Sequence, residues 1–265
     1  MNYGFIGTGN LPSAVIRGLI TSKAVDPEEI CVFDIDASKS AALAKEFDIT
    51  VSGSAAELTE TVKTVLIGVK PNIVPSVLEN IKPVVQKSPK LIVSLAAGKT
   101  LTELSACLPQ NTPIVRVMTN LNSAIGEGMS GICGNSFVTE EAFCKVQKLF
   151  GLIGKTITLD ESLFSTFLGL ASSAPAIVYM FIDTLARSGV KNGMDKKTAL
   201  AIASQTVIGS AKILAASDKH PWELIDNVCS PSGTTIEGIT SLLSTGFESS
   251  VINAVDAFIK KDSKK

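Results

Sequence analysis

The chain has 265 residues, of which 45% are apolar, and this is enough for one large or two modest domains around a substantial core. Its formal net charge of −1 gives no electrostatic footprint for nucleic acid or an anionic membrane, so neither is expected as a partner. The sequence has five scattered cysteines, which is an odd number, and no two of them form a C-x-x-C pair. This pattern argues against a disulfide framework or a zinc site. We therefore expect no metal and a location in the reducing cytoplasm.

The first residues predict a dinucleotide-binding strand-turn-helix. An apolar run at 3–6 meets Gly7-Thr8-Gly9, and the residues that follow can begin a helix. Gly7 allows the sharp turn, and Gly9 lets the backbone approach a pyrophosphate at the helix N-terminus. Pro12 stands where the motif usually has a third glycine, and proline is compatible with a first helical turn. The alternative is an ordinary tight turn without a ligand.

The second predicted strand, 30–34, ends in Asp34, which lies about 20 residues beyond the glycines, where a carboxylate would bind the ribose of a dinucleotide. Asp36 adds a second negative charge, and no Lys or Arg follows before Lys39. A 2′-phosphate would therefore meet two carboxylates, so we expect NADH to be favoured over NADPH. A solvated aspartate at a strand end is the alternative.

Short apolar runs alternate with helical patterns over the first part of the chain. Strands are expected at 3–6, 30–34, 64–69, 91–96, 114–118 and 155–159. Helices are expected between them at 10–22, 37–46, 73–85 and 101–107. This alternation predicts βαβ units and hence an α/β fold with a doubly wound, mainly parallel sheet. We assign this dinucleotide-binding domain to residues 1–160.

Beyond this point only helical patterns remain, at 161–190, 195–217, 221–228, 234–244 and 247–261. They predict an all-helical domain over residues 161–265. A helical domain with much apolar surface and no second layer often completes its core with another copy of itself. We therefore expect a homodimer through this domain, with further assembly left open.

One stretch of the helical domain raises the question of a membrane. Residues 163–182 hold no charge, and the stretch is long enough to span a bilayer. It also contains several hydroxyl residues and Pro175, and its flanks are Glu161 and Asp183 rather than Lys or Arg. We expect a helix buried on all sides, inside the helical domain or a dimer, and no membrane partner.

Ligands of open α/β sheets bind beyond the carboxyl ends of the strands. Small residues recur at those ends, and Lys70 is the only cation at such an end before Arg116. Lys70 is expected to contact the cofactor or orient the substrate, or else to cap its strand.

The loop 230–235, S-P-S-G-T-T, lies between two helical patterns. Its Gly233, Thr234 and Thr235 are able to present N–H groups and hydroxyls to a carboxylate at the start of a helix. The pattern alone slightly favours the other interpretation, an ordinary helix-capping loop.

Conventional acid–base groups are scarce, because His220 is the only histidine and adjoins a proline. Motifs for a serine hydrolase, a zinc protease or a P-loop are missing from the sequence. A protonated imine already carries positive charge and accepts hydride directly, so an enzyme acting on it needs mainly orientation and electrostatics.

The cysteines are expected to be small buried side chains: Cys31, Cys107, Cys133, Cys144 and Cys229.

Several motifs together resemble the pyrroline-5-carboxylate reductase family, in that family's order and spacing over nearly the whole chain. They are GFIGTGN at 4–10, GVKP at 68–71, SLAAG at 94–98, RVM with Asn120 at 116–120, GEGM at 126–129, SPSGTT with Gly238 at 230–238, GF at 246–247 and VINAVDA at 251–257. The resemblance implies a Rossmann domain, a helical dimerisation domain and reduction of the cyclic imine 1-pyrroline-5-carboxylate to proline by NAD(P)H, a step of proline biosynthesis.

The resemblance also implies roles for individual residues. The cofactor would contact Gly7, Thr8, Gly9, Asn10, Leu11, Asp34, Val69, Lys70, Pro71, Ala96, Ala97 and Gly98. The substrate would contact Asn120, Ser230, Gly233, Thr234 and Thr235. Thr235 is the residue expected near the imine. The substrate groups of the loop would come from the partner subunit of the dimer.

The chain departs from the family's motifs in several places. The loop M-P-N-T-P reads Met118-Thr119-Asn120-Leu121-Asn122, so both prolines are absent. The motif G-S-G-P-A-Y reads S-S-A-P-A-I over 172–177, S-P-G-G-T-T has Ser232 for one glycine, and an asparagine common near the adenosine ribose is Ala55. The alternative is therefore a divergent paralogue that reduces another cyclic imine, or a dinucleotide-binding regulator without turnover.

Overall fold

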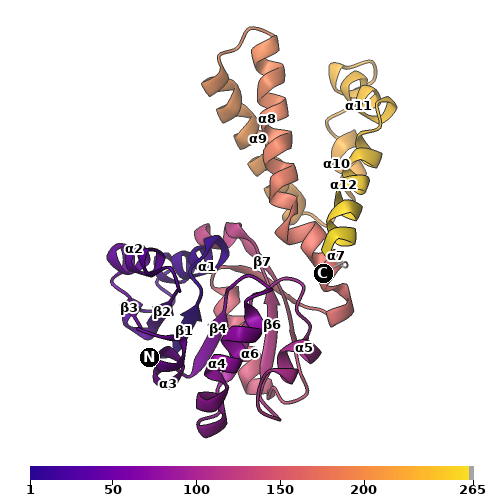
Figure 1. Ribbon diagram of the computed structural model, residues 1–265. Helices are drawn as coiled ribbons and strands as arrows, with labels where there is room; N and C mark the ends of the chain where they lie inside the picture. Colours follow the sequence, from indigo (N-terminus) through magenta and orange to yellow (C-terminus); the bar gives the residue numbers. More distant parts are fainter. Residues whose placement is uncertain (263–265) are drawn as a thin grey trace. The chain divides into compact units, whose positions relative to one another are not determined.

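The computed structural model describes residues 1–262, and the contacts within the chain divide it into two units (Figure 1). The first unit contains Met1–Ser172 and the residues from Ile259 onward. The second unit is Ser173–Phe258. The sequence-based prediction placed the division after residue 160, whereas the contacts assign the next twelve residues to the first unit.

The first unit is built on one eight-stranded sheet with the order β3-β2-β1-β4-β5-β6-β7-β8. The strands are β1 (Tyr3–Ile6), β2 (Ile30–Phe33), β3 (Thr50–Val51), β4 (Thr64–Ile67), β5 (Leu91–Ser94), β6 (Ile114–Met118), β7 (Gly128–Gly134) and β8 (Gly154–Thr158). All neighbours pair in parallel except β6 and β7. The order reverses between β1 and β4, which makes the carboxyl ends of these strands the natural ligand position.

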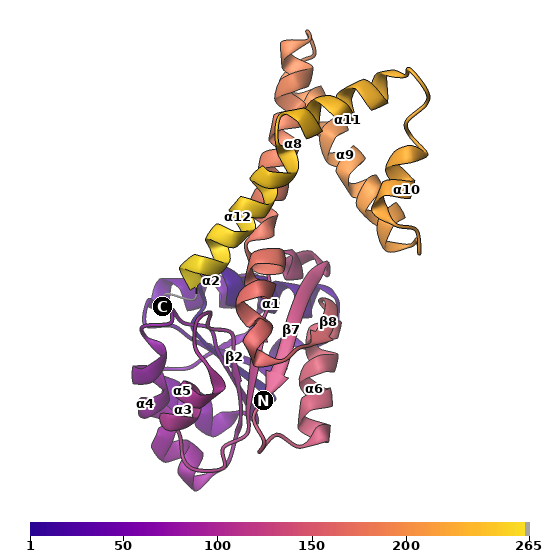
Figure 2. The ribbon, with the colours of Figure 1, turned by 90° about the vertical axis from the view of Figure 1, so that its right-hand side faces the viewer.

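Helices cover both faces of this sheet (Figures 1 and 2). They are α1 (Asn10–Thr21), α2 (Ala37–Phe47), α3 (Ala55–Thr61), α4 (Val74–Lys87), α5 (Leu101–Ala106), α6 (Glu140–Gly151) and α7 (Phe164–Phe167), with the 3-10 turns η1 (Pro27–Glu29), η2 (Leu121–Ile125) and η3 (Glu161–Leu163) and the π-helical turn η4 (Leu168–Ser172). Neighbouring strand residues point to opposite faces, so Phe5 lies in one core and Ile6 in the other. Both faces are therefore buried, as the apolar runs of the central strands predict.

The expected doubly wound, mainly parallel sheet is confirmed, but β3, β7, α3 and α6 were not predicted. β7 is the antiparallel strand, and its sequence GMSGICG contains three glycines. A Cβ on Gly131 would lie 3.1 Å from the ring of Phe167, so the absence of a side chain lets α7 pack against the strand. Glycine-rich strands carry little hydrophobic periodicity, which is why this one escaped prediction.

The second unit is entirely helical, as expected. Its helices are α8 (Ala174–Lys191), α9 (Lys196–Ala215), α10 (Pro221–Asp226), α11 (Thr234–Ser244) and α12 (Phe247–Asp262), the last of which runs into the first unit at its end. α8 and α9 lie side by side and are joined through small side chains, Ala186, Ala199 and Ala203 (Figure 1). This cluster is the whole buried apolar core found among the described residues of this unit.

In the single chain the stretch 163–182 is not buried on all sides, and its burial in a dimer, which the expectation also allowed, stays a prediction. Within it, Tyr179 is 59% exposed and Met180 is 73% exposed. By length and composition, Glu161–Lys191 and Lys196–Ala215 would suffice to cross a membrane, and only 11% of each apolar window is buried. Such helices are weak evidence for a span, since interface helices have the same composition.

Candidate dinucleotide and carboxylate sites

The turn between β1 and α1 has the geometry that the glycine motif predicts. Gly7 has φ +98°, and a Cβ there would lie 2.8 Å from the Gly68 backbone. A Cβ on Gly68 would in turn lie 2.2 Å from Pro12 Cγ. Gly68 therefore makes room for the proline that replaces the third glycine of the motif, and helix and strand still pack closely.

The N-terminus of α1 is open at Gly9. Gly9 is the N-cap residue, and no side chain caps the helix there among the described residues. A Cβ on Gly9 would meet no described atom within 4 Å, apart from its chain neighbours. The free N–H groups of the first turn, which belong to Asn10 and Leu11, are thus available to an anion such as a pyrophosphate.

Asp34, at the end of β2, is held in place by the same turn. Its Oδ2 accepts hydrogen bonds from the Thr8 amide (2.7 Å) and the Thr8 hydroxyl (3.0 Å), and its Oδ1 accepts one from the Asp36 amide (2.9 Å). Thr8 was predicted to contact the cofactor, but its side chain is buried. In the structure it orients the Asp34 carboxylate. The turn predicted to bind the pyrophosphate and the carboxylate predicted to bind the ribose therefore form one hydrogen-bonded structure.

Asp36 adds negative charge beside Asp34. A hydrogen bond from the Ser38 hydroxyl lowers the pKa of the Asp36 carboxyl below its usual value, and the Ser38 amide and Lys39 contribute in the same direction. Lys39 pairs with Asp36 at 3.4 Å. The first lysine after Asp34 in the sequence is therefore already paired with a carboxylate.

A cavity of about 300 Å³ opens between the carboxyl ends of β1, β2 and β4. It is lined by Ile6, Gly7, Phe33, Asp34, Ile35, Ser54, Ala55, Val69, Ile73, Ser76, Val77 and Asn80. Ala55 is thus a lining residue, as its place in the family's motif implies. Val69 was predicted as a cofactor contact, whereas the other large apolar residues of the wall, Ile6, Phe33, Ile35, Ile73 and Val77, were not. The signal available in the sequence was the apolar Ile35 directly after Asp34, and the structure leaves this side chain 97% exposed.

The remaining predicted cofactor residues lie at the ends of β4 and β5. Val69 lines the Asp34 cavity, and the exposed Lys70 is followed by Pro71 at the approach to α4. Ala96 and Ala97 continue from β5 towards Gly98, which has φ +67°. Gly98 lines a different cavity, together with Arg116 and Glu161, so the structure does not bring it to Asp34.

Asn120 follows β6 and is 6% exposed. Its Nδ2 donates to the carbonyl of Ala171 at 3.0 Å. Its Oδ1 is buried and has no hydrogen-bond partner among residues 1–262. A buried acceptor without a partner is costly, which makes this oxygen a candidate ligand contact.

The loop 230–235 belongs to the second unit and forms a tight turn before α11. The Gly233 amide donates to the Ser230 carbonyl at 3.0 Å, and Ser232 has φ +57°. This is the left-handed region that favours glycine, and the family's motif has glycine there. A Cβ on Gly233 would lie 2.3 Å from Ser230 Oγ and 3.0 Å from the Ser230 carbonyl oxygen, so a side chain there would force the Ser230 hydroxyl to turn away.

Gly233 is the N-cap of α11, and no described side chain caps the helix. The N–H groups that follow, those of Thr234 and Thr235, therefore face the loop without a capping partner. The capping interpretation of this loop predicted a Ser or Thr side chain on those N–H groups, and the structure has none. The geometry is compatible with binding a carboxylate.

His220 caps the N-terminus of α10. Its Nδ1 accepts the Trp222 amide at 3.2 Å, and Glu223 accepts the His220 amide at 2.9 Å, so the two side chains form a capping box for α10. Among residues 1–262, no group of three His, Cys, Asp or Glu side chains is placed to hold a metal ion. The first unit thus offers backbone N–H groups, a carboxylate and the Asn120 amide, and the loop 230–235 of the second unit offers backbone N–H groups and hydroxyls.

These features define a dinucleotide-binding protein of the oxidoreductase type: a Rossmann-like sheet with an open pyrophosphate turn and an oriented ribose carboxylate. The family model described as pyrroline-5-carboxylate reductase dimerisation matches residues 161–265, and the model described as NADP oxidoreductase coenzyme F420-dependent matches residues 2–98.

Relatives extend the match to the whole chain. Pyrroline-5-carboxylate reductase of Escherichia coli K12 is 37% identical over 98% of this chain and 97% of its own length. That of Arabidopsis thaliana is 35% identical over 97% and 93%. The crystal structure of the Streptococcus pyogenes enzyme superposes with a TM-score of 0.90 at 35% identity, covering 100% of this chain and 99% of that one. The Plasmodium falciparum structure with NADP bound has a TM-score of 0.90 at 30% identity, covering 99% and 97%. The chain belongs to the pyrroline-5-carboxylate reductase family.

Proposed function

We propose that the protein reduces 1-pyrroline-5-carboxylate to proline with hydride from NAD(P)H. The observation that carries this proposal is the presence, in one chain of this family, of an open pyrophosphate turn at Gly9 and an uncapped carboxylate loop at Gly233. A dinucleotide-binding regulator would need only the first of these. The comparisons give no support to the alternatives of another cyclic imine or a protein without turnover.

The residues of the first unit fit a nicotinamide dinucleotide. The Gly9 turn and the first N–H groups of α1 would bind its pyrophosphate, Asp34 its ribose hydroxyls, and the cavity wall around Ile35 its adenine. The cofactor, when bound, supplies the hydride. We assign the nicotinamide half to the predicted residues at the ends of β4 and β5, Val69 to Pro71 and Ala96 to Gly98.

The substrate carboxylate is assigned to the loop before α11. The uncapped N–H groups of Thr234 and Thr235 and the positive end of the helix dipole favour an anion there. The Thr235 hydroxyl is assigned to the imine, where it orients the ring and hydrogen-bonds its nitrogen. No proton donor for a developing alkoxide is needed, because a protonated imine takes up hydride to become a neutral amine.

NADH is proposed as the preferred dinucleotide. The support is electrostatic: Asp34 lines the cavity to which we assign the ribose, the Asp36 amide is hydrogen-bonded to it, and Lys39 is paired with Asp36. A 2′-phosphate would bring two negative charges to this position and find no free lysine in the turn. A ribose with both hydroxyls free would instead donate to the Asp34 carboxylate.

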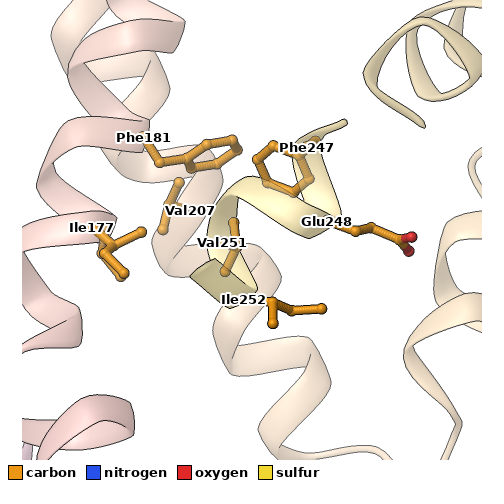
Figure 3. Close-up of a pocket in the computed structure, with 8 residues that line it drawn as sticks. Ile177, Phe181, Val207, Phe247, Glu248, Val251 and Ile252 are labelled. Carbon is orange, nitrogen blue, oxygen red and sulfur yellow. The ribbon is translucent and has the colours of Figure 1, made fainter. Parts of the chain in front are cut away.

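A homodimer through the second unit is proposed as the functional state, within the cytoplasm. The unit has an apolar groove of about 630 Å³ between α8, α9 and the start of α12 (Figure 3). The rings of Phe181 and Phe247 both line it, with their centroids 6.3 Å apart and their planes tilted by 51°, and Glu248 points away from them. A second copy that covers this surface would bury side chains that one chain leaves exposed.

The proposal is tested by mixing the purified protein with 1-pyrroline-5-carboxylate and following consumption of NADH and NADPH in parallel. Turnover with proline as the product is the expected result, with a higher kcat/KM for NADH. Protein that binds a dinucleotide but turns over with neither cofactor would overturn the assignment.

Thr235→Ala tests the role of the hydroxyl. We expect kcat/KM for the imine to fall about 100-fold, the order of effect of losing one active-site hydrogen bond, here the one that the Thr235 oxygen accepts from the imine N–H, with unchanged dinucleotide affinity. Thr240→Ala is the matched control, because that hydroxyl bonds only to carbonyls of its own helix, α11. Unchanged turnover in Thr235→Ala would remove the residue from the mechanism.

A further inference from the structure

The two segments in which this chain departs most from the family's motifs are hydrogen-bonded to each other. Ser172 Oγ donates to the Thr119 carbonyl at 3.0 Å, and Asn120 Nδ2 donates to the Ala171 carbonyl at 3.0 Å. Each segment thus gives a side chain to the backbone of the other. We call these two reciprocal bonds, which join the end of β6 to the π-helical turn η4, the 120–171 clamp.

A buried hydroxyl network supports the clamp from the other side. Thr119 Oγ1 accepts from Ser130 Oγ at 2.8 Å and shares a hydrogen bond with Ser123 Oγ at 3.0 Å. Thr119 is 2% exposed, and both serines are fully buried. The network ties the residue between β6 and Asn120 to β7 and to η2. Buried hydroxyls that satisfy one another in this way hold their backbones more rigidly than isolated bonds do.

The clamp determines which way the Asn120 amide faces. A carbonyl oxygen only accepts hydrogen bonds, so the Ala171 carbonyl must face Nδ2 and not Oδ1. Oδ1 is consequently directed elsewhere, buried and unpaired among the described residues. Its capacity to accept a hydrogen bond is therefore unused within the described part of the chain.

We propose that Thr119 and Ser172 are positioning residues for Asn120 and that they do here what the loop prolines do in the family's motif. This inference rests on the proposed function and on the substrate contact that the family resemblance implies for Asn120. A proline at position 119 has no hydroxyl for the network, and a glycine at 172 has no side chain for the clamp. The two departures from the motif therefore act together. Hydrogen bonds of the Thr119 and Ser172 hydroxyls restrict the loop in place of the prolines of the family's motif.

The test uses the full-length protein, with steady-state kinetics and hydrogen–deuterium exchange measured together. Thr119→Val removes the hydroxyl and keeps the shape of the side chain. We expect faster amide exchange at 118–125 and 168–173, and a kcat/KM for 1-pyrroline-5-carboxylate about tenfold lower, because a misplaced contact weakens orientation. The KM for NADH should be unchanged, and Thr119→Ser should restore both properties.

Two further variants keep the test decisive. Ser172→Ala breaks one bond of the 120–171 clamp at a half-buried position. It therefore tests the positioning of Asn120 even if Thr119→Val folds poorly. Thr112→Val is the matched control, because its buried hydroxyl bonds only to the Pro109 carbonyl. Wild-type exchange in both Thr119→Val and Ser172→Ala, or equal acceleration in Thr112→Val, would overturn the proposal. The exchange readout needs no substrate, so it remains informative if the wild-type protein fails to reduce the imine, an outcome that would count against the proposed function alone.

Discussion

At the residue scale, the proposed cofactor preference depends on Asp34, which is hydrogen-bonded to the turn between β1 and α1. Its carboxylate accepts three hydrogen bonds from the backbone and side chain of Thr8 and the backbone of Asp36. These bonds restrict rotation of the Asp34 side chain, so its carboxylate stays at the position that we assign to the ribose. A fixed carboxylate is favourable for two ribose hydroxyls and unfavourable for a phosphate, because only the hydroxyls can donate to it.

Replacing this carboxylate should change the cofactor preference. In Asp34→Ser, we expect the ratio of kcat/KM for NADH to that for NADPH to fall at least about tenfold, or about 1.4 kcal/mol. Parallel rate measurements with the two cofactors check this, with the exposed Asp218→Ser as the control for lost charge alone. An unchanged ratio would mean that Asp34 does not face the ribose.

The cysteines differ in chemistry according to their burial. Burial raises the pKa of the Cys133 thiol to about 12, and the nearby Glu161 adds to the effect. The expectation that every cysteine is buried is confirmed for Cys31 and Cys133, but Cys107 and Cys229 are only half-buried and Cys144 is exposed. Nucleophilic attack requires the thiolate, which Cys133 does not form at neutral pH.

Alkylation of the folded protein should therefore be selective. At pH 8, we expect iodoacetamide to modify Cys144 and to leave Cys133 intact, because the latter is both buried and protonated. Peptide mass spectrometry before and after denaturation measures the modification of each thiol. Rapid modification of Cys133 in the folded protein would show that its surroundings open in solution.

At the scale of an element, α5 shows how a short helix is stabilised at its start. The Thr100 side chain accepts from the Glu103 amide, and the Glu103 carboxylate accepts from the Thr100 amide at 2.8 Å. Hydrogen bonds from the Thr100 amide, followed by Lys99, lower the pKa of Glu103 below its ordinary 4.5. The folded state therefore favours the ionised form of this carboxyl.

The capping box predicts a pH-dependent loss of stability in Glu103→Ala. We expect a decrease of about 1 kcal/mol in the free energy of unfolding at pH 7, moderated because the carboxylate is solvent-exposed. Since the folded pKa is lowered, the contribution is present above 4.5 and is lost as the pH falls through the folded value. Denaturant titrations at pH 7 and pH 3 should show the difference between wild type and variant shrinking at the lower pH. A difference that does not depend on pH would assign the effect to side-chain packing.

At the scale of the whole molecule, the second unit poses a question of stability. Its internal core consists of the small residues between α8 and α9, and a Cβ on Gly189 would lie 3.0 Å from that of Ala199. The small side chains let the two helices approach closely but bury little apolar area. The larger apolar side chains, among them Phe181, Phe247 and Ile252, stay partly exposed in the single chain.

A dimer that covers these side chains predicts that assembly and folding are linked. We expect a homodimer by light scattering, with a melting temperature that rises with protein concentration. Phe181→Glu should weaken the dimer and lower the melting temperature of this unit. Phe137→Glu, which changes an exposed phenylalanine of the first unit, is the matched control. A wild-type monomer whose melting temperature does not depend on concentration would contradict the dimer.

The sequence by itself determined the parts that depend on local chemistry. The glycine turn, Asp34 at its strand end and the alternation of strands and helices follow from backbone freedom and hydrophobic periodicity, so the α/β fold and the helical second part were predictable. Tertiary structure alone decided the rest, because those features depend on contacts between residues far apart in the chain. They include the antiparallel β7, which has glycines in place of a hydrophobic pattern, and Gly68, which makes room for Pro12. The bond between Ser172 and Thr119 joins two segments 53 residues apart, and no local pattern of either segment predicts it.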